Sequence, residues 1–265
     1  MNSITILESY TNSYSRLANL VRGNRVSYAL KYGYDFVSLN GVETREWYWH
    51  NLTAIVKAIK ERVTNTEWIV WMDVDTIIMN NMVQMRMFVD GVSEEKCFVA
   101  SWFNAVGKRS FLTDNAMVTS CSDSVINSVH TGVIFVRNCY KSAVVLEEVI
   151  LDKRFEGMAD TLSFGAWDEY ALGLYYITYP DFAKLFSFIP LENICVVQED
   201  LDIFDNIRAK LRQMGQSIAN IPRKYREGDF ILHAMGRTTY DPEAPLRKYE
   251  VLEKYLNIIQ PDKKQ

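Results

Sequence analysis

The 265-residue sequence contains only four cysteines, and none belongs to a Cys-x-x-Cys pair. They lie far apart, at Cys97, Cys121, Cys139 and Cys195. Structural zinc sites usually draw on closely spaced cysteines or histidines, so the sequence does not indicate one. A disulfide stays open, although a reducing compartment is the simpler interpretation.

Long hydrophobic runs are absent as well. No apolar stretch approaches the roughly 18 residues that a helix needs to cross a bilayer, and no signal peptide precedes the first strand-like segment. We therefore expect no transmembrane segment. There is also no internal repeat, low-complexity tract or clear linker, which favours a single domain over residues 1–265.

The sequence has no excess of positive charge. It contains 29 Lys and Arg against 33 Asp and Glu, with the two signs mixed, for a net charge of −4. Because nucleic-acid-binding proteins usually carry a basic patch, we expect no nucleic-acid partner. Aromatic residues make up 13% of the chain. Core packing explains them, and surfaces that stack on sugars are the alternative.

Alternating strand and helix patterns predict an α/β fold. Residues 4–7 read as a strand, 14–31 as a helix that Gly33 can end, and 34–39 as a second strand, which together form a β-α-β unit. Apolar residues at helical spacing over 52–63 predict the next helix. Further predicted strands are 98–102, 131–136, 186–189, 194–197 and 229–232, and further helices are 82–88, 142–151, 167–176, 201–213 and 242–256. The expected architecture is a mostly parallel central sheet flanked by helices.

The most informative stretch is an apolar run, Trp68–Met72, followed by Asp73 and Asp75. Such a run is typical of a buried parallel strand, and the ligand crevice of an open α/β sheet lies at the carboxyl ends of its strands. Buried carboxylates are costly unless paired or bound to metal, and Mg²⁺ and Mn²⁺ prefer carboxylate oxygens. The alternative is that Asp73 caps the next segment and Asp75 is a solvated turn residue.

Two further positions combine polar side chains with apolar surroundings. Asn24 falls on the apolar face of the first helix beside Arg25, so it either bonds neighbouring backbone or lies near a nucleotide. His233 ends the last predicted strand and is a candidate third metal ligand beside the two aspartates. It could instead simply terminate the strand.

Two other segments invite a functional interpretation. Asp168 and Glu169 open a helix, where acidic residues also suit the helix dipole, so Asp168 as a cap is an alternative. Residues 103–129 are polar and weakly patterned, and we expect them to form an irregular loop that acts as a lid.

Several separated stretches, in the same order and over most of the chain, resemble glycosyltransferase family 34. This family comprises galactosyl-, mannosyl- and xylosyltransferases with a GT-A fold, a Rossmann-like α/β architecture. The stretches are Asn24-Arg25-Val26-Ser27-Tyr28-Ala29 with Gly33-Tyr34, Glu67 to Asp75, His130 to Cys139, Trp167-Asp168-Glu169-Tyr170-Ala171-Leu172 and His233-Ala234-Met235-Gly236.

The resemblance implies a metal-dependent, retaining transferase that moves a hexose or pentose from a UDP- or GDP-sugar to a glycan or other hydroxyl acceptor. Mn²⁺ or Mg²⁺ would be the cofactor. The implied roles are donor binding by Asn24, Arg25, Asp73, Val74, Asp75, Gly236 and Arg237, metal binding by Asp73, Asp75 and His233, contact with the sugar or acceptor by Thr131, Gly132 and Trp167, and catalysis by Asp168 and Glu169.

The sequence departs from the family pattern at three places. Glu169 stands where the family usually has Gln, and Asn51 stands where a diphosphate-binding Lys is common. Arg237 follows Gly236 where the family tends to have Cys and then Lys, and Arg237 is expected to supply the missing cation. Eukaryotic members usually carry a membrane anchor. Its absence implies a cytoplasmic bacterial or viral enzyme, or an excised catalytic domain of a Golgi-type protein.

Alternatives remain for both chemistry and class. Retention can follow from front-face attack assisted by the leaving phosphate, our first choice, or from a covalent intermediate on Asp168. A metal-dependent phosphoryl-transfer enzyme, either a sugar-nucleotide pyrophosphorylase or a phosphatase, is a rival. The chain lacks the Gly-rich phosphate loop that the first would need. A non-enzymatic carbohydrate-binding module would not need the metal ligands.

Overall fold

Strand β3 (Trp68–Met72) is buried along its whole length inside a six-stranded sheet. In this computed structural model, which describes residues 4–112, 117–156, 167–197, 208–215, 223, 225–234 and 244–259, the strand order is β2-β1-β3-β6-β5-β7. The pairs β1–β2, β1–β3 and β5–β7 are parallel, and β3–β6 and β5–β6 are antiparallel. The predicted α/β class is confirmed, with parallel pairings in the majority.

The other strands of this sheet are β1 (Ile4–Tyr10), β2 (Asp35–Asn40), β5 (Phe98–Leu112), β6 (Met117–Arg137) and β7 (Phe186–Ile189). A smaller sheet, in the order β4-β9-β8, contains β4 (Thr76–Ile78), β8 (Cys195–Val197) and β9 (Ile231–His233). The long helices are α1 (Ser15–Tyr32), α2 (His50–Lys60), α3 (Tyr140–Leu151), α5 (Trp167–Thr178) and α9 (Ala244–Ile259). Short helical segments are η1 (Asn12–Tyr14), η2 (Trp47–Trp49), η3 (Met85–Phe88), η4 (Lys153–Phe155), α6 (Pro180–Ala183) and α7 (Leu191–Ile194).

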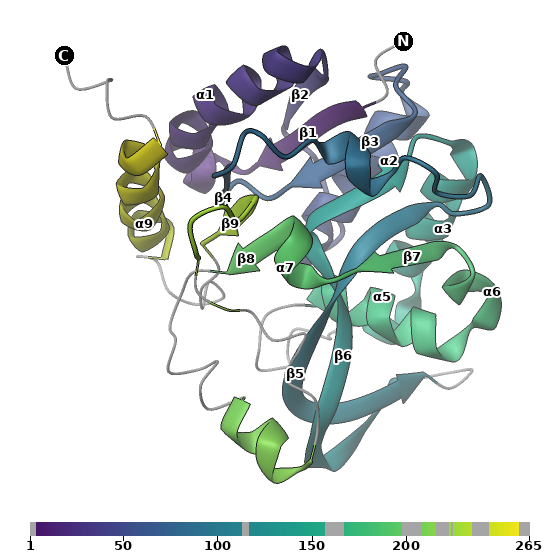
Figure 1. Cartoon of the computed structure of the whole chain (residues 1–265). Coiled ribbons are helices and arrows are strands. Elements are labelled where there is room, and N and C mark those ends of the chain that lie inside the picture. The colour runs from purple at the N-terminus through teal and green to yellow at the C-terminus, as the bar shows by residue number, and fades with distance from the viewer. Residues whose placement is uncertain are drawn as a thin grey trace.

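The two faces of the large sheet bury different sets of side chains, because successive strand residues point to opposite sides. Ile69 and Trp71 pack in the cluster that includes α2, α3 and α5. Trp68, Val70 and Met72 pack in a second cluster with residues of α1 and the smaller sheet. Helices therefore cover both faces (Figure 1), which explains why β3 is apolar without alternation.

The predicted secondary structure is largely confirmed along the chain, including the end of α1. Gly33 caps this helix in the left-handed conformation, with φ of 65°. The predicted helix over 82–88 is shorter, since only Met85–Phe88 is helical and as a 3-10 turn. Of the helix predicted over 201–213, residues 201–207 lie outside the described part and 208–213 are helical.

The prediction of an irregular lid over residues 103–129 is wrong. Residues 103–112 belong to β5 and residues 117–129 to β6, which pair antiparallel from Phe98↔Val136 to Leu112↔Met117 and form a ribbon that extends away from the sheet (Figure 1). The sequence did not reveal it because apolar alternation marks strands with one buried face. A ribbon held by backbone pairing beyond the core carries no such pattern.

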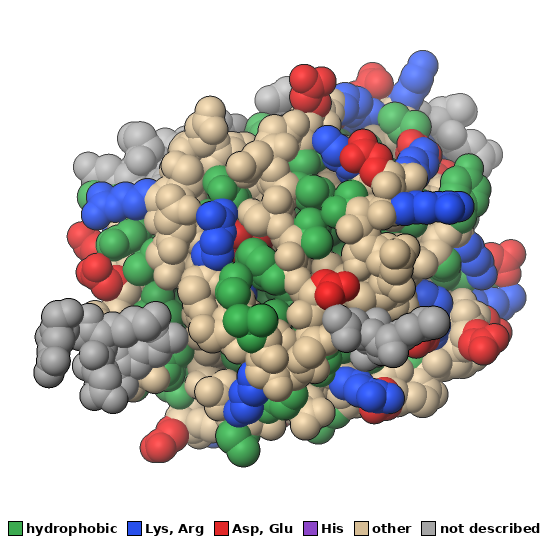
Figure 2. Space-filling model, turned by 90° about the horizontal axis from the view of Figure 1, so that it is seen from above, with side chains coloured by type: hydrophobic (Ala, Val, Ile, Leu, Met, Phe, Trp, Pro, Cys, Tyr) green, Lys and Arg blue, Asp and Glu red, His purple; other side chains and the backbone are tan. Residues whose placement is uncertain are grey.

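The surface of the molecule is mixed in charge. On the face that Figure 2 views from above, acidic and basic side chains are interspersed. Cys97, Cys139 and Cys195 are free thiols. Among the described helices, none combines the length and the apolar character needed to cross a bilayer.

Candidate functional site

The two aspartates lie in a tight turn that leaves the carboxyl end of β3. The Asp73 amide donates to the carbonyl of Gly132 on β6 at 2.9 Å, and the Thr76 amide donates back to the carbonyl of Asp73 at 3.0 Å. β4 starts at Thr76, so the chain changes sheets across Asp73 and Asp75. This change of direction turns both side chains toward the sheet edge, as the sequence predicts.

The side chain of Arg25 stabilises this turn by hydrogen bonds to its backbone. Its side chain is fully buried, and it pairs with Glu8 at 2.5 Å. The same guanidinium donates to the carbonyl of Asp73 and, at 2.9 Å, to the carbonyl of Thr76. A buried guanidinium needs this number of acceptors, and the turn supplies them. Arg25 therefore fixes the backbone that carries the acidic pair.

His233 reaches the acidic pair through the smaller sheet. β9 pairs antiparallel with β4 in a register that sets His233 opposite Thr76, and the Ala234 amide donates to the carbonyl of Asp75 at 2.8 Å. Cross-strand neighbours lie about 5 Å apart, so this register brings the imidazole beside the Asp75 carboxylate. Two sequence-distant strands thus meet at one point.

Three potential ligand atoms converge there. Nε2 of His233 lies 3.1 Å from Oδ1 of Asp75 and 3.8 Å from Oδ2 of Asp73. Asp75 is nearly buried, whereas the Asp73 side chain keeps 32% of its surface exposed. Two carboxylates and one imidazole within this distance of one another form a donor set that fits a divalent cation.

The electrostatics of the three groups differ. Burial, reinforced by Asp75, raises the pKa of Asp73 to about 6. Burial acts on Asp75 in the same sense, but Lys248 and His233 outweigh it and hold the pKa of Asp75 well below its usual range. Burial opposes the charged form of His233, yet the two aspartates raise its pKa above the ordinary value. Without a cation, the cluster therefore retains protons near pH 6.

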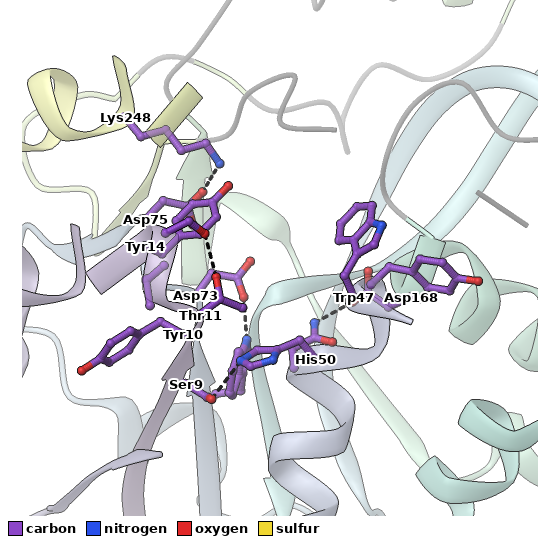
Figure 3. Close-up of a pocket in the computed structure, with 15 residues that line it drawn as sticks. Ser9, Tyr10, Thr11, Tyr14, Trp47, His50, Asp73, Asp75, Asp168 and Lys248 are labelled. Atoms are coloured by element: carbon purple, nitrogen blue, oxygen red, sulfur yellow. Dashed lines mark hydrogen bonds and ion pairs between the residues drawn. The ribbon is translucent and has the colours of Figure 1, made fainter. Parts of the chain in front are cut away.

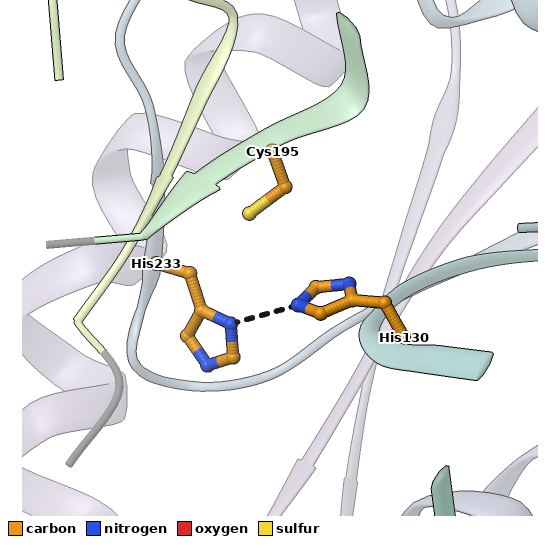
Figure 4. A group of neighbouring side chains, drawn as sticks. All are labelled: His130, Cys195 and His233. Carbon is orange, nitrogen blue, oxygen red and sulfur yellow. Dashed lines mark hydrogen bonds between the residues drawn. The ribbon is translucent and has the colours of Figure 1, made fainter. Parts of the chain in front are cut away.

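Two buried side chains lie behind His233 (Figure 4). Nδ1 of His233 is 3.3 Å from Nε2 of His130, and burial followed by His233 lowers the pKa of His130 to about 3. In the tautomer of neutral His130 that accepts at Nε2, the proton of His233 lies on Nδ1, and its Nε2 is then available to a cation. Burial raises the pKa of the neighbouring Cys195 thiol well above its ordinary value.

A cation that the sequence did not single out completes the cluster. Lys248, on α9, forms an ion pair with Oδ2 of Asp75, and both side chains are at most 8% exposed. Figure 1 shows α9 packed beside α1, which brings the C-terminal helix to the sheet edge. The patterning of residues 242–256 predicts this helix but carries no signal that one of its lysines turns inward.

These groups face a cavity of about 490 Å³. Figure 3 shows Asp75 and Lys248 on one side of it and Trp47 and Asp168 on the other. Val74, which we expect from the sequence to contact the donor, also lies on its wall. The complete lining consists of Ser9, Tyr10, Thr11, Ser13, Tyr14, Trp47, Tyr48, His50, Asn51, Trp71, Asp73, Val74, Asp75, Asp168 and Lys248. Most of the residues from Ser9 to Asn51 in this lining were not predicted, because loop aromatics and hydroxyls resemble ordinary surface.

Asp168 and Glu169, at the start of α5, occupy different environments. Oδ2 of Asp168, on the cavity wall, accepts hydrogen bonds of 2.6 Å from both Asn51 and the Thr131 hydroxyl. Glu169 lies behind it, where Oε1 accepts from the Thr131 amide at 3.0 Å and Oε2 has no partner among the described residues. Burial, and then Asp168, raises the pKa of Glu169 well above its ordinary range. A protonated Glu169 is close in shape and charge to the Gln expected there.

Four predicted contacts have other partners in the structure. The Asn24 amide bonds the backbone of Ile78 in both directions, at 2.8 and 2.9 Å, which is the role in backbone bonding left open above. Neither Asn24 nor Arg25 lines the cavity, and both bond the backbone around the turn.

Thr131 and Gly132, for which sugar or acceptor contacts are predicted, contact other residues of the chain. Thr131 is 3% exposed, and its hydroxyl donates to Asp168 while its amide donates to Glu169. Gly132 faces His233, and a Cβ there would lie 2.7 Å from Nδ1 of that ring. Trp167 begins α5, although its side chain lies outside the described part, as do Gly236 and Arg237.

Comparison with known proteins relates this arrangement to sugar transfer. The model of the galactosyl transferase GMA12/MNN10 family matches residues 4–239. No curated protein sequence matches the chain. Among solved structures, the chain is similar to a glycosyltransferase involved in the glycosylation of the major capsid of PBCV-1, with a TM-score of 0.57 and 14% identity over 95% of this chain and 98% of that one.

A second solved structure is the bifunctional glycosyltransferase WbbM in its apo form. The TM-score is 0.53 and the identity 12%, over 94% of this chain and 50% of that one, so the chain spans half of that protein. At these identities the two likenesses concern the fold alone.

Proposed function

Because the chain belongs to the galactosyl transferase GMA12/MNN10 family, glycosyltransferase family 34, we propose that it moves a hexose or pentose from a UDP- or GDP-sugar to a hydroxyl of a glycan, with retention and with a divalent cation held by Asp73, Asp75 and His233. Family membership makes the chain a glycosyltransferase. It decides against the phosphoryl-transfer enzyme and the carbohydrate-binding module that the sequence alone left open.

The single observation that carries the proposal is the approach of His233 Nε2 to Asp75 and Asp73, at 3.1 and 3.8 Å, on the edge of a ligand-sized cavity. Carboxylates suit Mg²⁺ and Mn²⁺ alike, and the imidazole shifts the preference toward the transition metal, Mn²⁺. When bound, the cation would neutralise the charge that develops on the leaving diphosphate.

The reaction exchanges one bond for another at the anomeric carbon. The bond from this carbon to the phosphate oxygen breaks, a bond to the acceptor oxygen forms, and the acceptor proton passes to the leaving diphosphate. The site residues bind the donor, align the acceptor hydroxyl and exclude water, so that hydrolysis does not compete. The cavity volume of about 490 Å³ is within the usual range for small-molecule sites.

Asp168 is the group we propose to stabilise the positive charge that develops on the sugar. Its Oδ2 is occupied by Asn51 and Thr131, and both hydrogen bonds reduce its strength as a nucleophile. This supports front-face attack over a covalent intermediate on Asp168. Glu169, behind it, would act by holding Thr131 in place.

The exposed aromatic ring at the cavity rim supports a glycan acceptor. Trp47 is 54% exposed although it is a large apolar side chain, and it lies on the same side as Asp168. Tryptophan faces pack well on sugar rings, since they are broad and apolar. Tyr14 lies at the other end, beside Asp75 and Lys248, where we propose that the nucleoside lies, and Tyr10 also lines the cavity.

The test is a panel of UDP- and GDP-sugars incubated with the protein and Mn²⁺, with release of the nucleoside diphosphate as the signal. One donor is expected to undergo slow hydrolysis that stops when EDTA removes the cation. In parallel, UDP or GDP is expected to raise the melting temperature only with Mn²⁺ present. Stabilisation that is equal with and without Mn²⁺, together with EDTA-resistant turnover, would contradict the metal-dependent mechanism.

A further inference from the structure

Lys248 occupies an unusual place for a lysine. It lies on α9, beyond residues 4–239 that the family model matches, and only 5% of it is exposed. Lysines are almost never buried unless their charge is compensated, and here the ion pair with Asp75 compensates it. The side chain nevertheless lines the cavity, and its ammonium group lies beside Asp75 at the cavity wall (Figure 3).

The ion pair raises a conflict with the proposed cation site. Oδ1 of Asp75 faces His233, while Oδ2 of the same carboxylate holds Lys248. A divalent cation at Asp73, Asp75 and His233 would neutralise Asp75 and repel the ammonium group a few ångströms away. The lysine stem has four rotatable carbons, so its charge can move without moving α9.

The destination of the ammonium group follows from the charges around the cavity. Asn51, which stands where a phosphate-binding lysine is common in the family, is neutral and donates to Asp168. A leaving diphosphate carries more negative charge than one divalent cation shared with two carboxylates can offset. Among the described residues that line the cavity, Lys248 is the only lysine or arginine.

We propose that Lys248 is a switched counter-ion: it neutralises Asp75 in the empty site and moves to the diphosphate of the donor once the divalent cation binds. The inference rests on the proposed function and adds to it a phosphate-binding residue outside the matched family segment. It predicts effects of opposite sign on the two ligands, because the ammonium group competes with the cation and cooperates with the phosphate.

The experiment measures both ligands by calorimetry in Lys248→Met, which keeps the length of the stem and removes the charge. Lys254→Met is the matched control, since Lys254 is an exposed lysine on the same helix. Mn²⁺ is titrated alone, and then UDP and GDP are titrated at saturating Mn²⁺. Lys248→Gln is a second neutral variant for the case that the Met variant melts below the assay temperature.

In the Lys248 variants, Mn²⁺ alone is expected to bind at least about threefold more tightly, because no ammonium group opposes it. The nucleoside diphosphate that the unaltered protein binds is expected to bind about tenfold more weakly, the usual scale for a lost charge-assisted hydrogen bond. Lys254→Met should match the unaltered protein in both titrations.

Parallel weakening of both ligands would overturn the inference, since it would make Lys248 a purely structural residue. Unchanged or weaker binding of Mn²⁺ alone would do the same. If the unaltered protein binds neither Mn²⁺ nor a nucleoside diphosphate, the proposed function fails and the inference fails with it. If the unaltered protein binds both and only the opposite-sign pattern is missing, the proposed function stands without the switch.

Discussion

Nε2 of His233 lies 3.1 Å from Oδ1 of Asp75, and the hydrogen-bonded register of β4 and β9 enforces this approach. The contact therefore depends on the backbone pairing of these two strands as well as on the two side chains. It also explains why the acidic pair alone is a weak signal in the sequence. The third ligand comes from a strand near the other end of the chain.

The first prediction concerns Asp75→Asn. This change keeps the shape of the side chain but removes the charge that Lys248 and a divalent cation share. Mn²⁺ affinity should fall by more than the roughly 10–100-fold that the loss of an outer-shell partner costs. Calorimetry with Mn²⁺ and then with UDP or GDP checks it. Asp90→Asn, at an exposed ion pair with Arg86, is the control and should change neither titration. Normal Mn²⁺ binding by the Asp75 variant would remove this residue from the site.

The second prediction is a pH dependence of cation binding. The pKa of Asp73 is raised from the ordinary 3.8 to about 6, and that of His233 is raised as well, so a cation displaces protons from both as it binds. Mn²⁺ affinity should fall as the pH drops through 6, by about tenfold per pH unit for each proton displaced. Titrations between pH 5 and 8 measure the slope, which should become shallower in Asp73→Asn.

The same shifts set the sign of the effect on folding. The cation-free folded chain binds more protons at Asp73 than the unfolded chain between about pH 4 and 6, so this group lowers the stability as the pH rises through that window. Mn²⁺ should offset the loss above pH 6. A melting temperature whose response to Mn²⁺ does not vary with pH would speak against the assigned protonation.

The third prediction tests the space beside His233. In Gly132→Ala the new Cβ would overlap the imidazole, at 2.7 Å from Nδ1, and the ring must shift. We expect a loss of about 1–3 kcal/mol in the free energy of unfolding, as for other overpacked sites, together with weaker Mn²⁺ binding. In Gly23→Ala a Cβ would meet nothing within 4 Å inside α1, so this control should be stabilised by about 0.5–1 kcal/mol. Equal melting temperatures for the two variants would refute the assigned packing.

The fourth prediction separates the neighbouring carboxyls Asp168 and Glu169. Asp168→Asn should lower kcat by roughly 100-fold or more with little change in donor KM, because its charge acts on the developing positive sugar. Glu169→Gln should stay within about threefold of the unaltered rate, since burial already favours the neutral acid at this position. Steady-state kinetics with the identified donor provide the test. A large loss of kcat in Glu169→Gln with none in Asp168→Asn would reverse the two roles.

Apolar periodicity was sufficient to predict most of the fold and the central part of the site. The unbroken run Trp68–Met72 marked the buried strand, and the polar residues directly after it marked the sheet edge. His233 was found for the same reason, as a polar residue that ends a buried strand. In each case the signal is local, because a run of consecutive apolar residues indicates the buried strand.

Residues whose role depends on distant partners gave no such signal. Arg25 binds the backbone of a turn that lies far along the chain, and no local pattern in the sequence indicates this contact. The lack of a side chain at Gly132 leaves room for the ring of His233, a residue about a hundred positions away. Lys248 sits in an amphipathic helix among other charged residues, and only the packing of α9 against the sheet edge distinguishes it.

The indole N–H of Trp71 donates to Oδ1 of Asp73 at 2.6 Å, from a ring that is 2% exposed. Any ligand that draws electron density from that carboxylate changes the electrostatic environment of the indole, on which the emission of tryptophan depends. Trp71 is therefore an intrinsic fluorophore that is hydrogen-bonded directly to the acidic pair. Binding of a closed-shell ion such as Mg²⁺ can be followed by fluorescence without a label, and Trp71→Phe identifies the part of the signal that comes from this ring.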